Sequence, residues 1–329
     1  DDDSAPDDDD DATPADDDDG TPANDDDSAP VDDDDSAAGD DDDSALAAEV
    51  YPGSFNMTLS SDAAGFCGTW TTIEGDLTIA GPGVTDLTLL DCLQEVGGDV
   101  YVSTTGLTQL GLTSLTTVGG MLTVESNASL ANLELPALSN LPGGMEIHHN
   151  ALVDLALPNL TQLGNTVIDE ELWLQDISDL GSVSAIQGAL SLGDPGTDPA
   201  DQDLPLLGSL TGLSSVLIVA SGVTISGAGA LGNLEGLSSL EQVGDSVIIT
   251  DNPTLGDLWG LASLATIGFQ LTIADNPQLS DADQLFNLAE VGGDVAIHGN
   301  PQLVLPDPGP MMTWLQGICA GTVQFWDNA

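Results

Sequence analysis

The stretch LTIADNPQL at residues 271–279 belongs to a unit that recurs along the chain. It returns as VIITDNPTL at 247–255 and as VAIHGNPQL at 295–303, so the three copies are evenly spaced. The short apolar alternation in each copy predicts one β-strand per unit, with Leu271 and Ile273 inward and Thr272 outward. One short strand per evenly spaced unit predicts a solenoid in which successive coils stack into a parallel sheet.

The repeat can be followed in both directions from this stretch, with about ten coils in all. Its period is 22–24 except in the middle, where Leu174 and Leu192 are 18 residues apart and Leu192 and Ile225 are 33 apart. Leu residues at every third position, as at 234, 237 and 240, predict short 3₁₀-like turns rather than full helices. A Gly after the Val or Ile that precedes each strand predicts a tight corner there. The strand residues assigned by this spacing are Ile79, Val102, Val124, Ile147, Leu174, Leu192, Ile225, Ile249, Ile273 and Ile297.

The composition excludes several classes of function. The 329 residues include 56 Asp and Glu but no Lys or Arg. Binding of nucleic acid by phosphate neutralisation, a Lys-containing phosphate loop and a Lys Schiff base are therefore excluded. An anionic membrane surface repels such a chain, and divalent cations are its natural partners. No apolar run reaches the length of a membrane span.

The acidic charge is concentrated at the N-terminus, where the first 43 residues contain 23 Asp. Like charges, in a stretch where no segment can bury apolar surface, predict a disordered, Asp-rich spacer over 1–47. The alternative is a low-affinity tail that binds calcium or mineral. The rest, 48–329, is predicted to be the solenoid, with an N-terminal cap over 48–92, regular coils over 93–303 and a C-terminal cap over 304–329. A chain that starts with DDDSAP without Met is expected to be an exported, processed product.

The cysteines and the C-terminal segment predict how the solenoid ends. Cys67 precedes the strand residue Ile79 by nearly the same chain length as Cys92 precedes Val102, so the two fall at nearly the same place on adjacent coils. Stacked coils are about 4.8 Å apart, which predicts a Cys67–Cys92 disulfide. Cys319 is interpreted as a buried spare thiol. Residues 308–320 are predicted to form a short capping helix that turns four side chains inward: Met311, Trp314, Leu315 and Ile318.

Four stretches resemble the receptor L-domain family: VGDSVIITDNPTL at 243–255, IGFQLTIADNPQL at 267–279, VGGDVAIHGNPQL at 291–303 and FCGTWTTIEGDLTI at 66–79. That family includes the ligand-binding L domains of insulin- and epidermal-growth-factor-type receptors and coils in bacterial exported lipoproteins. The resemblance covers about 67–303. It implies a mainly β to α/β fold, a right-handed parallel β-solenoid related to leucine-rich-repeat horseshoes. It implies no catalytic residues and transfers no binding residues.

The acidic leader also resembles the spacer that follows the lipidated Cys of bacterial surface lipoproteins. This second resemblance implies a lipid anchor upstream of residue 1 and a place at the cell surface.

One Asn recurs three residues after the strand residue of many coils. A row of such inward side chains can hydrogen-bond backbone groups of its own and neighbouring coils, so we interpret it as a structural ladder. Asp251 and Asp275 precede two of these Asn and are candidate calcium ligands, but neighbouring coils have other residues at this position, which favours the structural ladder over a metal site. The predicted ladder consists of Asn127, Asn150, Asn252, Asn276 and Asn300.

The outward strand positions supply the candidate ligand surface, which consists of Tyr101, Thr123, Glu146 and Trp173. Exposed aromatic side chains on a rigid face are common binding anchors. His148 and His149 are expected to point to opposite faces and, like His298, to be surface residues without a metal. The acids at 169–171 beside Trp173 leave a carbohydrate-active enzyme as an alternative, since such enzymes need paired carboxylates.

Together these patterns predict an exported, cell-surface binding or structural module without catalysis or a cofactor, apart from loosely bound Ca²⁺. The predicted ligand is a surface glycan or a protein. The alternatives are a polysaccharide hydrolase or lyase on the same scaffold and a calcium-dependent surface-layer or matrix component.

Overall fold

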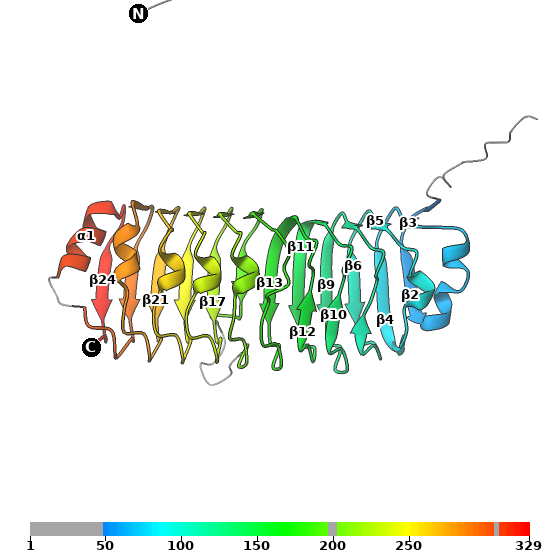
Figure 1. Ribbon diagram of the computed structural model, residues 1–329, viewed down its shortest axis with the longest axis horizontal. Coiled ribbons are helices and arrows are strands. Elements are labelled where there is room, and N and C mark those ends of the chain that lie inside the picture. The colour runs from blue at the N-terminus through cyan, green and yellow to red at the C-terminus, as the bar shows by residue number, and fades with distance from the viewer. Residues whose placement is uncertain (1–48, 197–202, 306–308) are drawn as a thin grey trace, which may run out of the picture. The chain divides into compact units, whose positions relative to one another are not determined.

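The computed structural model describes residues 49–196, 203–305 and 309–329. The predicted spacer at 1–47 lies outside these residues. The described chain forms a parallel β-solenoid of about 11 turns, whose coils stack in one row from the blue to the red end in Figure 1. No helix in the described part of the chain is both long and apolar enough to cross a bilayer.

One long strand from each coil contributes to the main sheet. Each of these strands pairs in parallel with its counterpart in the next coil, so that Ile249 lies opposite Ile273 and Ile273 opposite Ile297. The long strands are β2 (Phe55–Leu59), β4 (Leu77–Gly83), β6 (Val100–Ser103), β9 (Met121–Glu125), β11 (Asn140–His148), β13 (Gln162–Asp169), β15 (Leu190–Leu192), β17 (Val223–Ser226), β19 (Val247–Thr250), β21 (Leu271–Ala274), β23 (Val295–His298) and β24 (Val323–Trp326).

A second row of very short strands precedes the long strands. These are β1 (Val50–Tyr51), β3 (Thr72–Ile73), β5 (Glu95–Val96), β8 (Thr117–Val118), β14 (Ala185–Ile186), β16 (Ile218–Val219), β18 (Gln242–Val243), β20 (Thr266–Ile267) and β22 (Glu290–Val291). A separate three-stranded sheet consists of β7 (Gln109–Leu110), β10 (Asn132–Glu134) and β12 (Asp154–Ala156).

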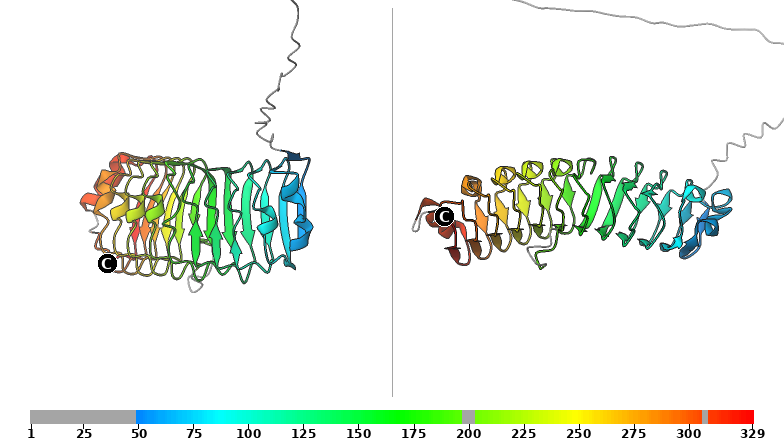
Figure 2. Two further views of the ribbon diagram at one scale, coloured as in Figure 1. Left: turned by 45° about the vertical axis from the view of Figure 1, so that its right-hand side comes forward. Right: turned by 90° about the horizontal axis from the view of Figure 1, so that it is seen from below.

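Short helical turns complete the coils, as the Leu spacing predicts, and in the yellow and orange coils they line up along one side (Figure 2). The 3₁₀ turns are η1 (Ser60–Ala63), η2 (Phe66–Gly68), η3 (Thr88–Leu90), η4 (Thr211–Leu213), η5 (Glu235–Leu237), η6 (Trp259–Leu261) and η7 (Asp283–Asn287), and the one α-helix of the described chain is α1 (Pro310–Ile318).

The sheet has more coils than the ten that the sequence predicts, because it extends into both terminal segments. Met57 of β2 lies opposite Ile79, and Phe325 of β24 lies opposite Ile297. Each of these coils covers one open end of the stacked core. The added strands are less regular in sequence, which is why the spacing alone misses them.

The predicted corner glycines are explained by close approach between coils. A Cβ at Gly244 would meet the carbonyl oxygen of Ala220 at 2.1 Å, and one at Gly268 would meet that of Gly244 at 2.0 Å. Any larger residue would therefore push the coils apart, away from the spacing of about 4.8 Å that their hydrogen bonds need. The corner packs backbone against backbone, and only glycine fits.

The two ends of the solenoid are closed differently. At the N-terminal end the predicted Cys67–Cys92 disulfide is confirmed, with a Cα–Cα distance of 5.4 Å. At the other end α1 buries Met311 and Leu315 as predicted. The prediction that Trp314 points inward is wrong, since 42% of its surface is exposed and its ring lies against that of Phe286 on η7.

Cys319 follows α1 and is free, but it is half-buried rather than fully buried. Its thiol donates a hydrogen bond to the carbonyl oxygen of Gly293, at 2.8 Å.

Candidate functional site

One column of outward side chains runs along the sheet, one residue before each inward strand residue. Tyr101, Thr123 and Glu146 lie side by side in this column, because Tyr101 pairs with Thr123 and Thr123 with Glu146. All three side chains are half-buried. The next position of the column, opposite Glu146, is Val167 of β13. Three of the four predicted ligand-binding residues are therefore neighbours on adjacent strands.

The fourth predicted residue, Trp173, does not lie on a strand, so its assignment to this column is wrong. The strand residue of its coil is Ile168, which pairs with Ile147, and not Leu174. Trp173 follows in a turn, where 56% of its surface is exposed. The alternation in Leu172–Trp173–Leu174 imitates a strand, but Leu174 belongs to the core beyond the turn.

A second outward column lies one residue after the inward position and contains most of the charge. Glu125, His148 and Asp169 are neighbours in it, since Glu125 pairs with His148 and His148 with Asp169. The hydroxyl of Tyr101 donates a hydrogen bond to Glu125 Oε1, and this bond raises the pKa of the tyrosine. His148 Nε2 lies 3.2 Å from Glu125 Oε2.

The chain turns sharply at the end of these strands and brings two more titratable groups to the cluster. His149 and Glu170 both have left-handed backbones, with φ of 57° and 50°. His149 Nδ1 lies 3.0 Å from His148 Nδ1, and His149 Nε2 lies 2.7 Å from Glu170 Oε2. The expectation that His148 and His149 point to opposite faces is therefore wrong, because it assumed an extended backbone at His149.

The two imidazoles have more contacts than they have protons to share. Their four nitrogens take part in three contacts: with Glu125, with each other and with Glu170. Two neutral imidazoles carry two N–H groups between them. All three contacts are thus satisfied at once only when one ring carries a second proton or a cation takes that proton's place.

Asp169, the acidic residue next to His148 in this column, is affected by partial burial of its carboxyl group. Burial is the main cause that raises the pKa of Asp169, opposed by the nearby His148. Asp169 Oδ1 is buried without a hydrogen-bond partner in the described structure. A chain without Lys or Arg has few means to balance such a group, so this part of the face favours a positively charged occupant.

The ladder runs behind the cluster and includes a member that the sequence did not predict. Glu171 is fully buried at the position of the Asn, where its Oε1 accepts hydrogen bonds from the backbone N and Nδ2 of Asn150 at 2.9 and 2.7 Å. Burial raises the pKa of Glu171. The five predicted Asn all lie in the ladder, and Asn328 extends it at the C-terminal end.

Asp251 and Asp275, the calcium candidates, occupy the same left-handed position as His149, with φ of 57° and 54°. Gly299 takes this place in the next coil, with φ of 67°. Asp tolerates this conformation better than most residues with a side chain. The backbone thus accounts for both residues. Neither belongs to the one group of three or more potential metal ligands found in the described residues.

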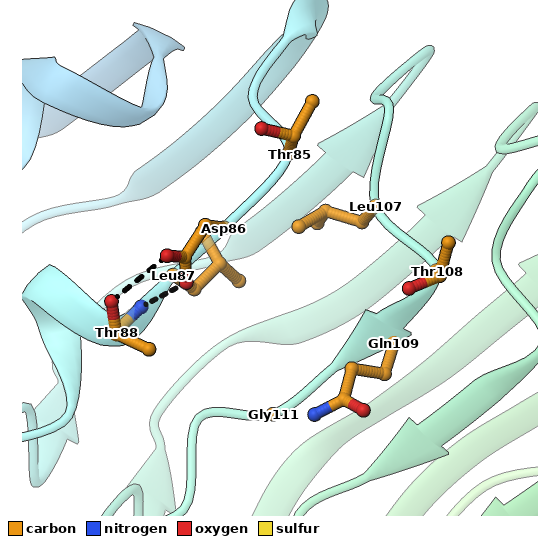
Figure 3. Close-up of a pocket in the computed structure, with 8 residues that line it drawn as sticks. All are labelled: Thr85, Asp86, Leu87, Thr88, Leu107, Thr108, Gln109 and Gly111. Atoms are coloured by element: carbon orange, nitrogen blue, oxygen red, sulfur yellow. Dashed lines mark hydrogen bonds between the residues drawn. The ribbon is translucent and has the colours of Figure 1, made fainter.

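A pocket near the N-terminal coils is too small to compete with the open face as a binding site. It encloses about 230 Å³, below the ~300–1,000 Å³ of typical ligand pockets. Figure 3 shows its lining, including Asp86, whose carboxylate accepts hydrogen bonds from the backbone N and hydroxyl of Thr88 at 2.8 and 3.0 Å. These bonds close a local turn, which accounts for the acid in structural terms.

The outer face of β6, β9, β11 and β13, together with the turns that hold His149, Glu170 and Trp173, is the candidate site, and we call it the outer-face cluster. Its strands give it a fixed geometry, and its side chains combine an aromatic hydroxyl, two imidazoles and several carboxylates.

Compared with known families and curated proteins, the chain matches no family model and no curated sequence.

Proposed function

We propose that this protein is a non-enzymatic binding module, exported and displayed at the cell surface on its acidic N-terminal segment, and that it binds through the outer-face cluster. One observation carries the proposal: on a sheet whose outward positions are otherwise mostly small or hydroxylated, aromatic, imidazole and carboxylate groups gather on four adjacent strands. The coil unit and its buried Asn ladder support an L-domain-like relationship.

The chemistry of the cluster favours a surface glycan over an extended apolar partner. Glu146 can accept hydrogen bonds from sugar hydroxyls, and the exposed indole of Trp173 offers a flat apolar surface at the rim. The half-buried neighbours hold these groups in place, which lowers the entropic cost of binding. A protein with a basic patch is the second ligand class, because the chain has a formal net charge of −56.

One observation supports the carbohydrate-active enzyme as a second candidate. Asp169 has a raised pKa and lies beside other carboxylates, which is an arrangement that acid catalysis uses. Against it, the site is an open face, whereas glycosidic cleavage needs two carboxyl groups that flank a bound sugar ring. Hydrolysis or elimination of a bound glycan by the purified chain would favour the enzyme.

A glycan array and a protein-binding screen, run with Ca²⁺ and with a chelator, test the proposal. Glu146→Ala and Trp173→Ala are expected to weaken any ligand that the wild type binds. Trp259→Ala is the matched control, because Trp259 is also exposed, at 66%, but lies on η6 far along the chain. If both cluster variants bind as the wild type does, or if Trp259→Ala alone loses binding, the face is not the binding site.

A further inference from the structure

His148, His149 and Glu170 lie close enough together to hold one metal ion. Each offers a ligand atom, and the three atoms lie within 4.8 Å of one another. The closeness of two consecutive side chains depends on the left-handed backbone of His149, with φ of 57°. We propose that these three residues form a site for a divalent cation of the Zn²⁺ class, a property that goes beyond the proposed ligand binding and does not depend on it.

The ligand atoms suit such an ion and need only small movements to bind it. Zn²⁺ binds imidazole nitrogen at about 2.0–2.1 Å, so tetrahedral geometry places two nitrogens about 3.3 Å apart. The Nδ1 atoms of His148 and His149 are 3.0 Å apart. Glu170 contacts the other nitrogen of His149, but its side chain is 41% exposed and that of His149 is 56% exposed. Both can therefore turn toward a shared ion without disturbing the core.

The surroundings supply the charge and the support that a cation needs. Glu125 contacts His148 Nε2 at 3.2 Å, so it can orient that ring while Nδ1 binds the ion, as carboxylates do beside many metal-bound histidines. In a chain without Lys or Arg the ion is a natural source of positive charge beside Asp169.

The donor set selects the kind of ion. Two imidazole nitrogens and one carboxylate suit Zn²⁺, Ni²⁺, Co²⁺ and Cu²⁺. Ca²⁺ prefers six to eight oxygens and Mg²⁺ an oxygen octahedron, so neither is favoured here. Three protein ligands leave a coordination position open, and the exposure of His149 and Glu170 turns that position toward solvent.

The repeat itself provides substitutions that remove each ligand and keep the fold. Thr250 stands at the position of His148 in another coil, Gly299 at that of His149 and Ser126 at that of Glu170. His148→Thr, His149→Gly and Glu170→Ser therefore place residues that this backbone already accommodates. His298→Ala is the matched control, since the ring of His298 stacks on Trp326 at 4.0 Å, six coils from His148.

The test is a calorimetric titration of the full chain with ZnCl₂ in an excess of Mg²⁺, which occupies the Asp runs of the N-terminal segment. We expect one saturable Zn²⁺ site per chain. Each cluster variant should weaken it at least about 10-fold, and His298→Ala should leave it unchanged. NMR of the imidazole nitrogens should show His148 and His149 shifting on Zn²⁺ binding while His298 does not.

Saturable binding that survives all three cluster variants, or the lack of any saturable site, would overturn the proposal. A variant whose melting temperature falls is set aside in favour of the other two, each of which removes a ligand independently. Because no glycan or protein ligand is present, failure here leaves the proposed binding function standing, and failure of the ligand screen leaves this site standing.

Discussion

Replacing Asn276 by Ala is expected to destabilise the solenoid more than almost any other single substitution of a polar residue. The side chain of Asn276 is fully buried and makes five hydrogen bonds. Its Nδ2 donates to Ile249 O at 3.0 Å, to Ala274 O at 2.8 Å and to Asn300 Oδ1 at 3.3 Å. Its Oδ1 accepts from the backbone N and the Nδ2 of Asn252, both at 3.1 Å.

The size of the effect follows from these bonds. A neutral hydrogen bond contributes a net ~0.5–1.5 kcal/mol, and a buried group left without a partner costs about 1–3 kcal/mol. Ala at 276 removes this partner from the Asn252 N–H, from Ile249 O and from Ala274 O, of which Ala274 O keeps the hydrogen bond from the Asp251 amide at 3.3 Å. We therefore expect the free energy of unfolding to fall by about 3–5 kcal/mol, at the upper end for single substitutions.

Urea denaturation followed by circular dichroism measures the loss in free energy of unfolding, and amide hydrogen exchange shows which coils lose stability. Exchange should accelerate most at the amide of Asn252, which donates to Asn276, and should stay slow at the amide of Asn127, which donates to Asn150.

Asp275→Gly is the control, because the neighbouring position 299 is already Gly with a left-handed backbone; its effect should stay within about 1 kcal/mol. A loss below about 1 kcal/mol for Asn276→Ala, or equal losses for the two variants, would refute the ladder as a main source of stability.

Three further predictions concern charge and the two ends. The melting temperature should rise with NaCl, because salt screens the repulsion among the 33 acidic residues outside the first 43. The rise should be about 2–4 °C for each kcal/mol of repulsion removed, and a melting temperature that does not change with NaCl would contradict this. Changing Cys67 and Cys92 to Ser together should cost about 2–4 kcal/mol, and unchanged urea curves would count against it. Hydrogen bonds from Thr322 lower the pKa of Asp294, so the folded state binds this proton more weakly than the unfolded chain. The resulting stabilisation is present above the ordinary Asp range near 3.9 and is lost as pH falls through the lowered value. The protection of the β24 amides relative to intrinsic exchange should fall in acid, and Asp294→Asn should remove that pH dependence; β24 protection insensitive to both would refute the contact.

The C-terminal coils were predictable because each element of the unit has its own physical reason. Ile249, Ile273 and Ile297 must face one core, the corner glycine must let two backbones approach, and the buried Asn must hydrogen-bond backbone carbonyls of its own and the preceding coil. These constraints recur together at a constant period, so they reinforce one another. The disulfide followed from the same register.

The middle coils were harder because different residues satisfy the same constraints there. Glu171 replaces the ladder Asn, so the coil lacks its clearest marker and the spacing points to Leu174 as the strand residue instead of Ile168. That shift hides the alignment of Asp169–Glu170–Glu171 with His148–His149–Asn150. A signal does exist, since a residue suited to a left-handed backbone and then a buried polar residue follow most strands.

The outer-face cluster could not be predicted from spacing, since two adjacent histidines meet only when the second one leaves the extended conformation. Asp251, Asp275 and His149 all have a left-handed backbone. This conformation explains the two Asp residues without calcium, and at His149 it brings the imidazole against that of His148.

The claim that His148, His149 and Glu170 of the outer-face cluster form a Zn²⁺ site is tested most directly by X-ray diffraction at the Zn absorption edge, from crystals of the full chain grown with ZnCl₂ and excess Mg²⁺. We expect one anomalous difference peak between the side chains of His148, His149 and Glu170, about 2.0–2.2 Å from their ligand atoms. A cluster without such a peak, in crystals that hold Zn²⁺ beside His298 or elsewhere, would contradict the claim.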